Sequence, residues 1–342
     1  MRYSIAAARP LALAAALACA APAARANDTT AEIATGGLIF VTTDAIEMRS
    51  EKLFISTEQV RVIYEFFNKS DKDVTTLVAF PLPEIRVANQ DDNVAVPSVE
   101  PNNVFGFKTT VDGAPVKVEV EQRVTAVGID RTQYLRALGI PLDPHLPATN
   151  QALDKLPPDK WPDLVALGLA EIVEYDNTGK GMQKHLEARW GLATTYYWKQ
   201  TFPAKKQIVI QHQYVPSVGG SAQTELGAPN QATLPGYADY PKKYCIDQAF
   251  MATIQSLRKA NKSEFGPPYG EQRIDYILKT GANWSGPIGS FELTVDKGSP
   301  DALVSFCGKN VKKISATQFQ MQQKDFSPEG DLAVLILTKI QN

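Results

Sequence analysis

The stretch 60-VRVIYEFFNKSDKDVTTLVAFPLP-83 decides the fold class of this chain. Its first part alternates with a period of two, which places every second residue on one face of a strand: Val60, Val62, Tyr64 and Phe66. A polar turn at 68–72 follows, and alternation resumes from Val74 to Phe80. Pro81-Leu82-Pro83 ends this second strand, because proline cannot donate a hydrogen bond to a β-ladder. The stretch therefore predicts two short strands joined by a turn.

Similar strand patterns occur on both sides of this stretch. The turn signal Asp112-Gly113 separates two of them, and the apolar run Leu332–Leu337 predicts a fully buried central strand. Many short strands between turn signals favour a mainly β fold of antiparallel β-sandwich lobes. The further strands are predicted at 105–111, 116–121, 194–202, 208–214, 274–280, 291–295, 303–307 and 332–337.

Two segments depart from the strand pattern. Residues 129–191 carry helical spacing and several prolines, and they predict a helical insertion on the β scaffold. Residues 245–259 predict one amphipathic helix in the C-terminal lobe. In the insertion, one helical stripe repeats at intervals of three and four residues: Trp161, Val165, Leu169 and Ile172.

The first 26 residues predict a cleavable signal peptide. Arg2 and Arg9 precede a short Ala/Leu run, and Ala24-Arg25-Ala26 has the small-x-small pattern of a cleavage site. The mature chain is then expected to begin at Asn27 and to fold outside the cytoplasm, in the periplasm. An alternative is lipid attachment at Cys19, which would tether the chain to a membrane. The remaining boundaries predict an N-terminal β-sandwich lobe (27–128), the helical insertion (129–191) and a C-terminal β-rich lobe (192–342).

Charge and cysteine content restrict the classes of partner. Removal of Arg2, Arg9 and Arg25 with the signal segment leaves 32 basic residues against 37 acidic ones, a net charge of −5. A mildly acidic chain with dispersed charges has no electrostatic footprint for nucleic acid or for an anionic membrane surface, and no integral membrane segment is expected after residue 26. Cys245 and Cys307 are the cysteines beyond the signal, and in an oxidising compartment they predict one disulfide bond.

Several motifs together resemble a family of secreted bacterial proteins catalogued as a domain of unknown function. They are Asn27-Asp28-Thr29-Thr30-Ala31, residues 48–56, Phe67-Asn68-Lys69-Ser70, Phe80-Pro81-Leu82-Pro83 and Thr195-Tyr196-Tyr197-Trp198. The resemblance implies a location in the envelope of Gram-negative bacteria and no known activity. Residues 58–120 are also similar to the vault/inter-alpha-trypsin domain, a β-sandwich associated with protein–protein interaction. That similarity is an analogy of fold.

No set of residues predicts catalysis, a cofactor or a metal. His212 alternates with apolar strand residues and is expected in the core, and His185-Leu186-Glu187 lacks the cysteines of a deaminase. Ser256-Leu257-Arg258-Lys259 matches a Ser-x-x-Lys motif, but the accompanying motifs do not occur at workable spacing.

Aromatic residues give the remaining indication of a binding surface, because Tyr and Trp combine a large contact area with a polar tip. We expect Trp190, Tyr197 and Trp284 as ligand- or partner-binding residues, with Trp284 partly exposed in a glycine-rich turn. Strand parity places Tyr196 and Trp198 in the sandwich core.

The sequence thus favours a non-catalytic periplasmic binding or protein-interaction module of the cell envelope. The expected partner is an envelope protein or a glycan. The alternative is a carbohydrate or cell-wall hydrolase that uses a pair of carboxylates. Two carboxylates facing each other across a deep aromatic cleft would favour the hydrolase.

Overall fold

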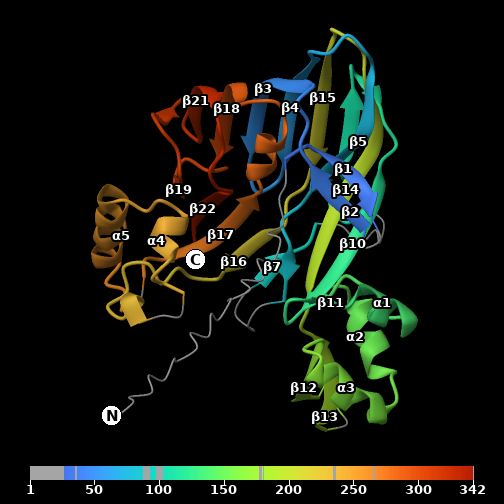
Figure 1. The fold of residues 1–342 in the computed structure, drawn as a ribbon. Helices are drawn as coiled ribbons and strands as arrows, with labels where there is room; N and C mark the ends of the chain where they lie inside the picture. The colour runs from blue at the N-terminus through green and yellow to red at the C-terminus, as the bar shows by residue number, and fades with distance from the viewer. Residues whose placement is uncertain are drawn as a thin grey trace, which may run out of the picture.

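The computed structural model describes residues 27–341 apart from 35–36, 88–92, 98–102, 177–178, 180, 234–235 and 265. The predicted signal peptide, residues 1–26, lies outside the described residues. The fold is mainly β, as the alternating pattern predicts, and its strands form three main sheets and a small hairpin (Figure 1).

Sheet B is the largest sheet and contains the stretch that begins at Val60. Its strands are antiparallel except for β3 and β18, which pair in parallel from Ser50–Ser290 to Ile55–Val295. In spatial order they are β20 (Lys312–Lys313), β21 (Gln318–Phe326), β18 (Ile288–Asp296), β3 (Ile46–Ile55), β4 (Val60–Asn68), β15 (Gln207–Tyr214), β8 (Lys108–Val111) and β9 (Ala114–Pro115).

Sheets A and C are each smaller than sheet B. Sheet A consists of β11 (Ile129–Asp130), β10 (Glu119–Ala126), β14 (Gly191–Phe202), β5 (Val74–Pro81), β1 (Thr29–Ala34) and β2 (Gly37–Val41), with β6 (Ile85–Arg86) also on β14. Sheet C consists of β19 (Leu303–Phe306), β22 (Leu332–Lys339), β17 (Tyr269–Tyr276), β16 (Val218–Ser221) and β7 (Asn93–Ala95). Residues Leu332–Leu337 of β22 are all buried, as predicted.

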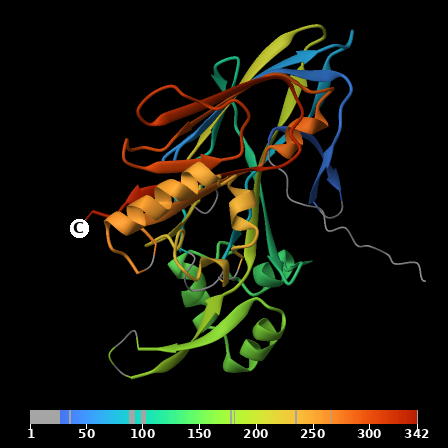
Figure 2. The ribbon, with the colours of Figure 1, turned by 90° about the vertical axis from the view of Figure 1, so that its left-hand side faces the viewer.

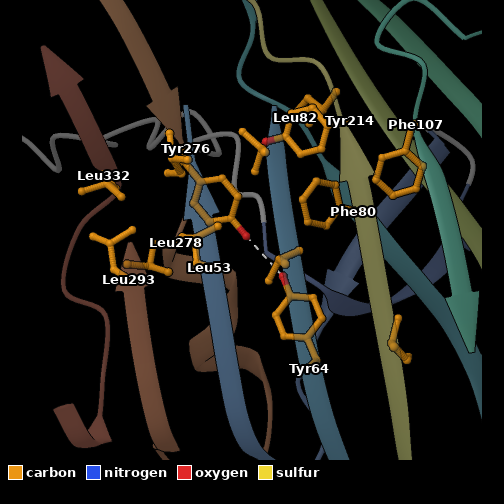
Figure 3. Packing of buried hydrophobic residues seen from close by; sticks show 14 of the residues in the cluster. Leu53, Tyr64, Phe80, Leu82, Phe107, Tyr214, Tyr276, Leu278, Leu293 and Leu332 are labelled. Carbon is orange, nitrogen blue, oxygen red and sulfur yellow. Dashed lines mark hydrogen bonds between the residues drawn. The ribbon is translucent and has the colours of Figure 1, made fainter. Parts of the chain in front are cut away.

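One hydrophobic core joins the three sheets. The predicted inward face of β4 is fully buried, and the same cluster contains residues of sheet A such as Phe80 and of sheet C such as Ile274. The rings of Phe80 and Tyr276 lie 6.4 Å apart, so sheets A and C meet over the inner face of sheet B (Figure 3). Strands from the regions predicted as two lobes therefore share sheet B, a long-range pairing that local periodicity does not encode.

The insertion forms a small appendage with its own core (Figure 1). Beside the predicted helices it contains a β-hairpin, so it is mixed rather than purely helical. Its elements are α1 (Thr132–Ala137), α2 (Pro147–Asp154), η1 (Pro158–Lys160), α3 (Trp161–Ala166), β12 (Ala170–Tyr175) and β13 (Gln183–Ala188).

The predicted helical stripe from Trp161 to Ile172 is wrong: within α3 the buried residue is Leu164 while Val165 is 41% exposed, and the helix ends before Leu169 and Ile172. Gly168 adopts a φ of +69°, and the N–H groups of Gly168 and Leu169 donate to the carbonyls of Val165 and Leu164. This pattern is a Schellman motif, which ends the helix. Ile172 therefore lies in β12 and is exposed.

The predicted C-terminal helix is confirmed with a later start. The Asp247 carboxylate accepts a hydrogen bond from the Phe250 N–H at 2.7 Å, so α5 (Gln248–Ala260) begins after this N-cap. Its apolar residues pack with Leu335 and Leu337 on the outer face of sheet C (Figure 2). The other short helices are η2 (Gln231–Thr233), α4 (Tyr240–Lys243) and η3 (Lys279–Asn283).

Candidate functional site

A fully buried group of polar side chains lies where the three sheets meet. We call it the seam cluster and define it as Asn27, Asp28, Glu51, Tyr64, His212 and Tyr276. The first two residues precede β1, whose pairing with β5 directs the start of the described chain into the core. Buried polar groups are costly unless they are hydrogen-bonded, so the partners of these side chains decide what the cluster can do.

The segment around η3 holds the two N-terminal residues in place. The Thr280 hydroxyl donates to the carbonyl of Asn27 at 2.7 Å, and the Trp284 indole N–H donates to the carbonyl of Asp28 at 2.5 Å. The packing is tight, because a Cβ atom on Gly281 would lie 2.7 Å from the side-chain amide nitrogen of Asn27. Residues 27–28 are therefore fixed by a segment near the other end of the chain.

Asp28 and His212 form a buried pair. The His212 Nε2 atom lies 2.9 Å from Oδ1 of Asp28, and both side chains are 0% exposed. Burial raises the pKa of the Asp28 carboxyl, and the neighbouring His212 partly opposes that shift. The aromatic rings of Tyr64, Phe80 and Phe107 lie 4.9–5.7 Å from the imidazole and exclude water from it.

Glu51 belongs to a second buried chain of hydrogen bonds. The Asn27 amide donates to Oε2 of Glu51 at 3.0 Å, and the Tyr64 hydroxyl donates to Oδ1 of Asn27. The hydroxyls of Tyr64 and Tyr276 lie 3.2 Å apart, so the chain reaches from sheet B to sheet C (Figure 3). Burial raises the pKa of Glu51 to about 8, the Asn27 hydrogen bond opposes the shift, and the charge of Asp28 adds to it.

The shift of Glu51 makes a pH dependence testable. Its pKa is higher in the folded state than the ordinary 4.5, so the folded state holds a proton that the unfolded state releases between about pH 4.5 and 8. In a chain in which Ala26 is still linked to Asn27, the free energy of unfolding should fall by about 1 kcal/mol per pH unit over this window. Urea denaturation at pH 5, 6.5 and 8 measures the slope.

In the Glu51→Gln variant the free energy of unfolding should depend less on pH over the same window, because glutamine resembles the protonated carboxyl and does not titrate. Glu65→Gln, a half-buried position on the neighbouring strand β4, is the matched control and should keep the wild-type slope. Equal slopes for wild type and Glu51→Gln would contradict the assignment.

The seam cluster is closed off from solvent: five of its residues are 0% exposed, and Tyr276, 1% exposed, is the member that also borders the cleft described next. Solvent reaches instead a cleft of about 710 Å³ between the end of sheet A and the C-terminal part of the chain. That volume lies in the range of small-molecule sites. The cleft is lined by Pro83, Glu84, Arg86, Asp239, Lys242, Lys243, Asp275, Tyr276, Ile277, Cys307, Gly330, Asp331, Leu332 and Ala333.

Each wall of the cleft is held by identifiable contacts. On one wall, Arg86 pairs with Glu84 at 2.7 Å. On the other, Lys243 of α4 pairs with Asp275 of β17 at 3.1 Å, and the Tyr240 hydroxyl donates to Oε2 of Glu271 at 2.6 Å. These bonds fix α4 to sheet C and so set the position of that wall.

A disulfide bond between Cys245 and Cys307 confirms the predicted pairing and closes the same region. Cys307 itself lines the cleft, and Cys245 lies two residues after the end of α4. The bond therefore ties α4 to the end of β19 across a sequence separation of 62 residues.

Two exposed charged side chains of the cleft, Asp239 and Lys242, have no hydrogen bond or ion pair among the described residues. Asp331, by contrast, accepts hydrogen bonds from the main-chain N–H groups of Leu278 and Lys279. Asp239 and Lys242 lie beside apolar residues that form part of the lining, Ile277, Leu332 and Ala333. A site with one free cation, one free anion, the main-chain-bonded carboxylate of Asp331 and apolar residues in its lining suits a ligand that carries both charges and an apolar body.

The predicted aromatic binding residues lie elsewhere. Trp190 is 1% exposed in the core of the appendage and donates its indole N–H to the carbonyl of Leu142 at 2.8 Å. Trp284 is 3% exposed, so the expectation that it is partly exposed is wrong: its indole N–H is used on Asp28. Tyr197 is half-buried on β14, and its hydroxyl donates to Glu119 at 2.8 Å. The three residues do not form one surface.

Parity alone predicted the core positions of Tyr196, Trp198 and His212, and it is confirmed for all three. It gave no sign of the Asp28 partner, which is 184 residues away from His212. The cleft also escaped prediction, because its lining residues come from five separate segments. For the seam cluster, the sequence offered one indication: the polar residues Asn27 and Asp28 directly follow the predicted cleavage site.

No helix in the described part of the chain has the length and apolar character needed to cross a bilayer. Across those same residues, no group of three or more His, Cys, Asp or Glu side chains has a geometry that would hold a metal ion.

Comparison with known proteins places the chain in a family. The family model described as "Domain of unknown function (DUF4424)" matches residues 26–335, and the chain belongs to this family. No curated protein matches the chain. Among solved structures, the chain is similar to a Legionella pneumophila protein described as a candidate nutrient-binding protein. That chain shares 17% sequence identity, with 92% of this chain and 70% of the other covered and a TM-score of 0.44.

Proposed function

We propose that this protein is a non-catalytic binding module of the bacterial cell envelope and that the cleft holds its ligand. The observation that carries the proposal is the cleft itself, a solvent-accessible hollow of about 710 Å³ with charged walls and apolar lining residues. Its walls come from two parts of the chain, a position where ligand sites commonly occur. The predicted signal peptide supports the envelope location.

The proposed ligand is a small zwitterion with an apolar body, the chemistry of an amino acid or a short peptide. In this arrangement Lys242 binds a carboxylate and Asp239 binds an ammonium group. The apolar part of the ligand lies on Ile277 and Leu332. The internal pairs Arg86–Glu84 and Lys243–Asp275 shape the walls and stay intact.

Burial raises the pKa of three carboxyl groups, those of Asp28, Glu51 and Asp143, and their buried positions argue against the hydrolase alternative. Asp28 and Glu51 are both fully buried, so neither can donate a proton to a glycosidic bond or accept one from water in the cleft. A general acid must lie within hydrogen-bonding distance of the group it protonates. Their environment fits a role in the core.

The test is titration of the mature chain with free amino acids and with di- to tetrapeptides by calorimetry. We expect Lys242→Glu to weaken the binding of the best ligand at least tenfold, since a hydrogen bond to a charged group contributes roughly 1.5–3 kcal/mol. Lys259→Glu on α5 changes an exposed lysine outside the cleft lining and should leave Kd unchanged.

Failure of every compound to bind, or equal affinity in wild type and Lys242→Glu, would remove the cleft as the site. Release of product from oligosaccharides by the purified chain would contradict the non-catalytic assignment. Mass spectrometry of the envelope fraction tests the location, because the proposal expects a mature chain that begins at Asn27.

A further inference from the structure

The residues that follow the predicted cleavage site are buried rather than free. Asn27 and Asp28 are both 0% exposed. Cleavage after Ala26 would turn the main-chain nitrogen of Asn27 into an α-ammonium group. A charge in such a place is costly unless an opposite charge compensates it.

Two buried carboxyl groups in the same place have unused acceptor atoms. Oδ2 of Asp28 and Oε1 of Glu51 have no hydrogen-bond partner among the described residues. His212 is the positively ionisable group that contacts this region, and it faces Oδ1 of Asp28. The described part of the cluster thus holds two carboxyls against one imidazole.

Covalent geometry limits the distance from the main-chain nitrogen of Asn27 to Oε2 of Glu51 to roughly 8 Å. Four covalent bonds separate that nitrogen from the side-chain amide nitrogen, so the two atoms lie within roughly 5 Å of each other. That amide nitrogen is 3.0 Å from Oε2 of Glu51. The Thr280 and Trp284 hydrogen bonds and the close approach of Gly281 fix the residue and leave its nitrogen little freedom to move.

We propose that removal of residues 1–26 places the α-ammonium of Asn27 against the Glu51 carboxylate in the seam cluster, and that this ion pair completes the core of the processed protein. The inference rests on the predicted cleavage, which is also part of the proposed envelope location. The unprocessed chain has a neutral amide at this position and cannot form the pair.

The ion pair changes the pKa values of both partners in a defined direction. Without the ammonium, burial keeps Glu51 protonated at neutral pH, since its pKa is about 8. With the ammonium, the pKa of Glu51 falls and the pKa of the α-amino group rises, because each charge stabilises the other. The pair then stabilises the fold between these two values and is lost as pH rises through the raised pKa of the amine. The ionisable groups that face it are Asp28, His212, Tyr64 and Tyr276.

The test compares chains with defined first residues, released by a protease from a fusion protein and oxidised to form the disulfide. One chain begins at Asn27 and the other at Ala26, and each is made with Glu51 and as Glu51→Gln. We expect the extra alanine to lower the Tm by about 4 °C or more at pH 7. In the Glu51→Gln background the loss should be less than half as large. Glu65→Gln is the matched control and should keep the full loss.

A second measurement needs no substitution. An amine-reactive reagent at pH 7 should modify the α-amino group of the Asn27 chain at least tenfold more slowly in the folded than in the urea-unfolded state. Equal rates, or a Tm loss of the same size with and without Glu51, would overturn the proposal. These chains have fixed ends and carry no ligand, so the outcome is independent of whether the protein is exported and whether the cleft binds.

Discussion

Replacement of His212 by alanine is expected to lower the free energy of unfolding by about 3–5 kcal/mol, because it removes one member of a fully buried pair. The Asp28 carboxyl would lose its 2.9 Å partner and keep an oxygen atom that already has none among the described residues. The imidazole also fills space between four aromatic rings, those of Tyr64, Phe80, Phe107 and Trp198, so its loss leaves a cavity. Urea denaturation at pH 7 measures the change.

The appendage supplies a matched control for this prediction. His185 Nδ1 lies 2.8 Å from Oδ2 of Asp154, which is close to the 2.9 Å between His212 and Asp28. The Asp154 side chain, however, is 31% exposed and can be solvated. His185→Ala should therefore lower the free energy of unfolding clearly less than His212→Ala does. Equal losses would show that removal of the imidazole volume, rather than the buried carboxyl, determines the effect. Asp28→Asn combined with His212→Ala completes a double-mutant cycle that isolates the coupling.

Removal of the disulfide has the second large expected effect. A Cys245→Ser, Cys307→Ser variant should lose about 4 kcal/mol of stability in the chain-entropy model for a loop of this length. The residues around α4 should also exchange their amide hydrogens faster, because the bond ties this helix to the end of β19. Urea denaturation and hydrogen exchange provide the two readouts.

Reduction of the wild-type chain serves as the control for the disulfide. Dithiothreitol should lower the wild-type stability to that of the double variant and leave the variant unchanged. If the double variant is as stable as the oxidised wild type, the remaining contacts of α4, such as Tyr240 with Glu271, are sufficient to hold that wall of the cleft.

Local pattern was enough to predict much of the scaffold. The alternation at Val60–Phe66 follows directly from burial of one strand face, and the apolar run Leu332–Leu337 from burial of both. The disulfide followed from compartment and cysteine count. The end of α3 was missed because apolar spacing continues through Gly168, although a glycine in the left-handed region terminates the helix there.

The residues of the candidate site could not be predicted from local sequence patterns, for a different reason. Pairing of Asp28 with His212 and assembly of the cleft both depend on which strands become neighbours, and periodicity gives the face of a strand but not its neighbour. His212 was correctly expected in the core, yet only the pairing of β1 with β5 in sheet A, and the packing of that sheet on sheet B, bring Asp28 to it. The aromatic residues predicted to bind a ligand include two whose rings fill hydrophobic cores instead.

The parallel pairing of β3 with β18 sets an order of events during biosynthesis. Residues 46–55 emerge early, but their neighbour on one side, residues 288–296, is synthesised near the end. Asn27 and Asp28 likewise have hydrogen-bond partners, Thr280 and Trp284, that are synthesised near the end of the chain. Contacts of such high sequence separation form slowly. A nascent chain with this topology cannot complete sheet B until residues 288–296 are available.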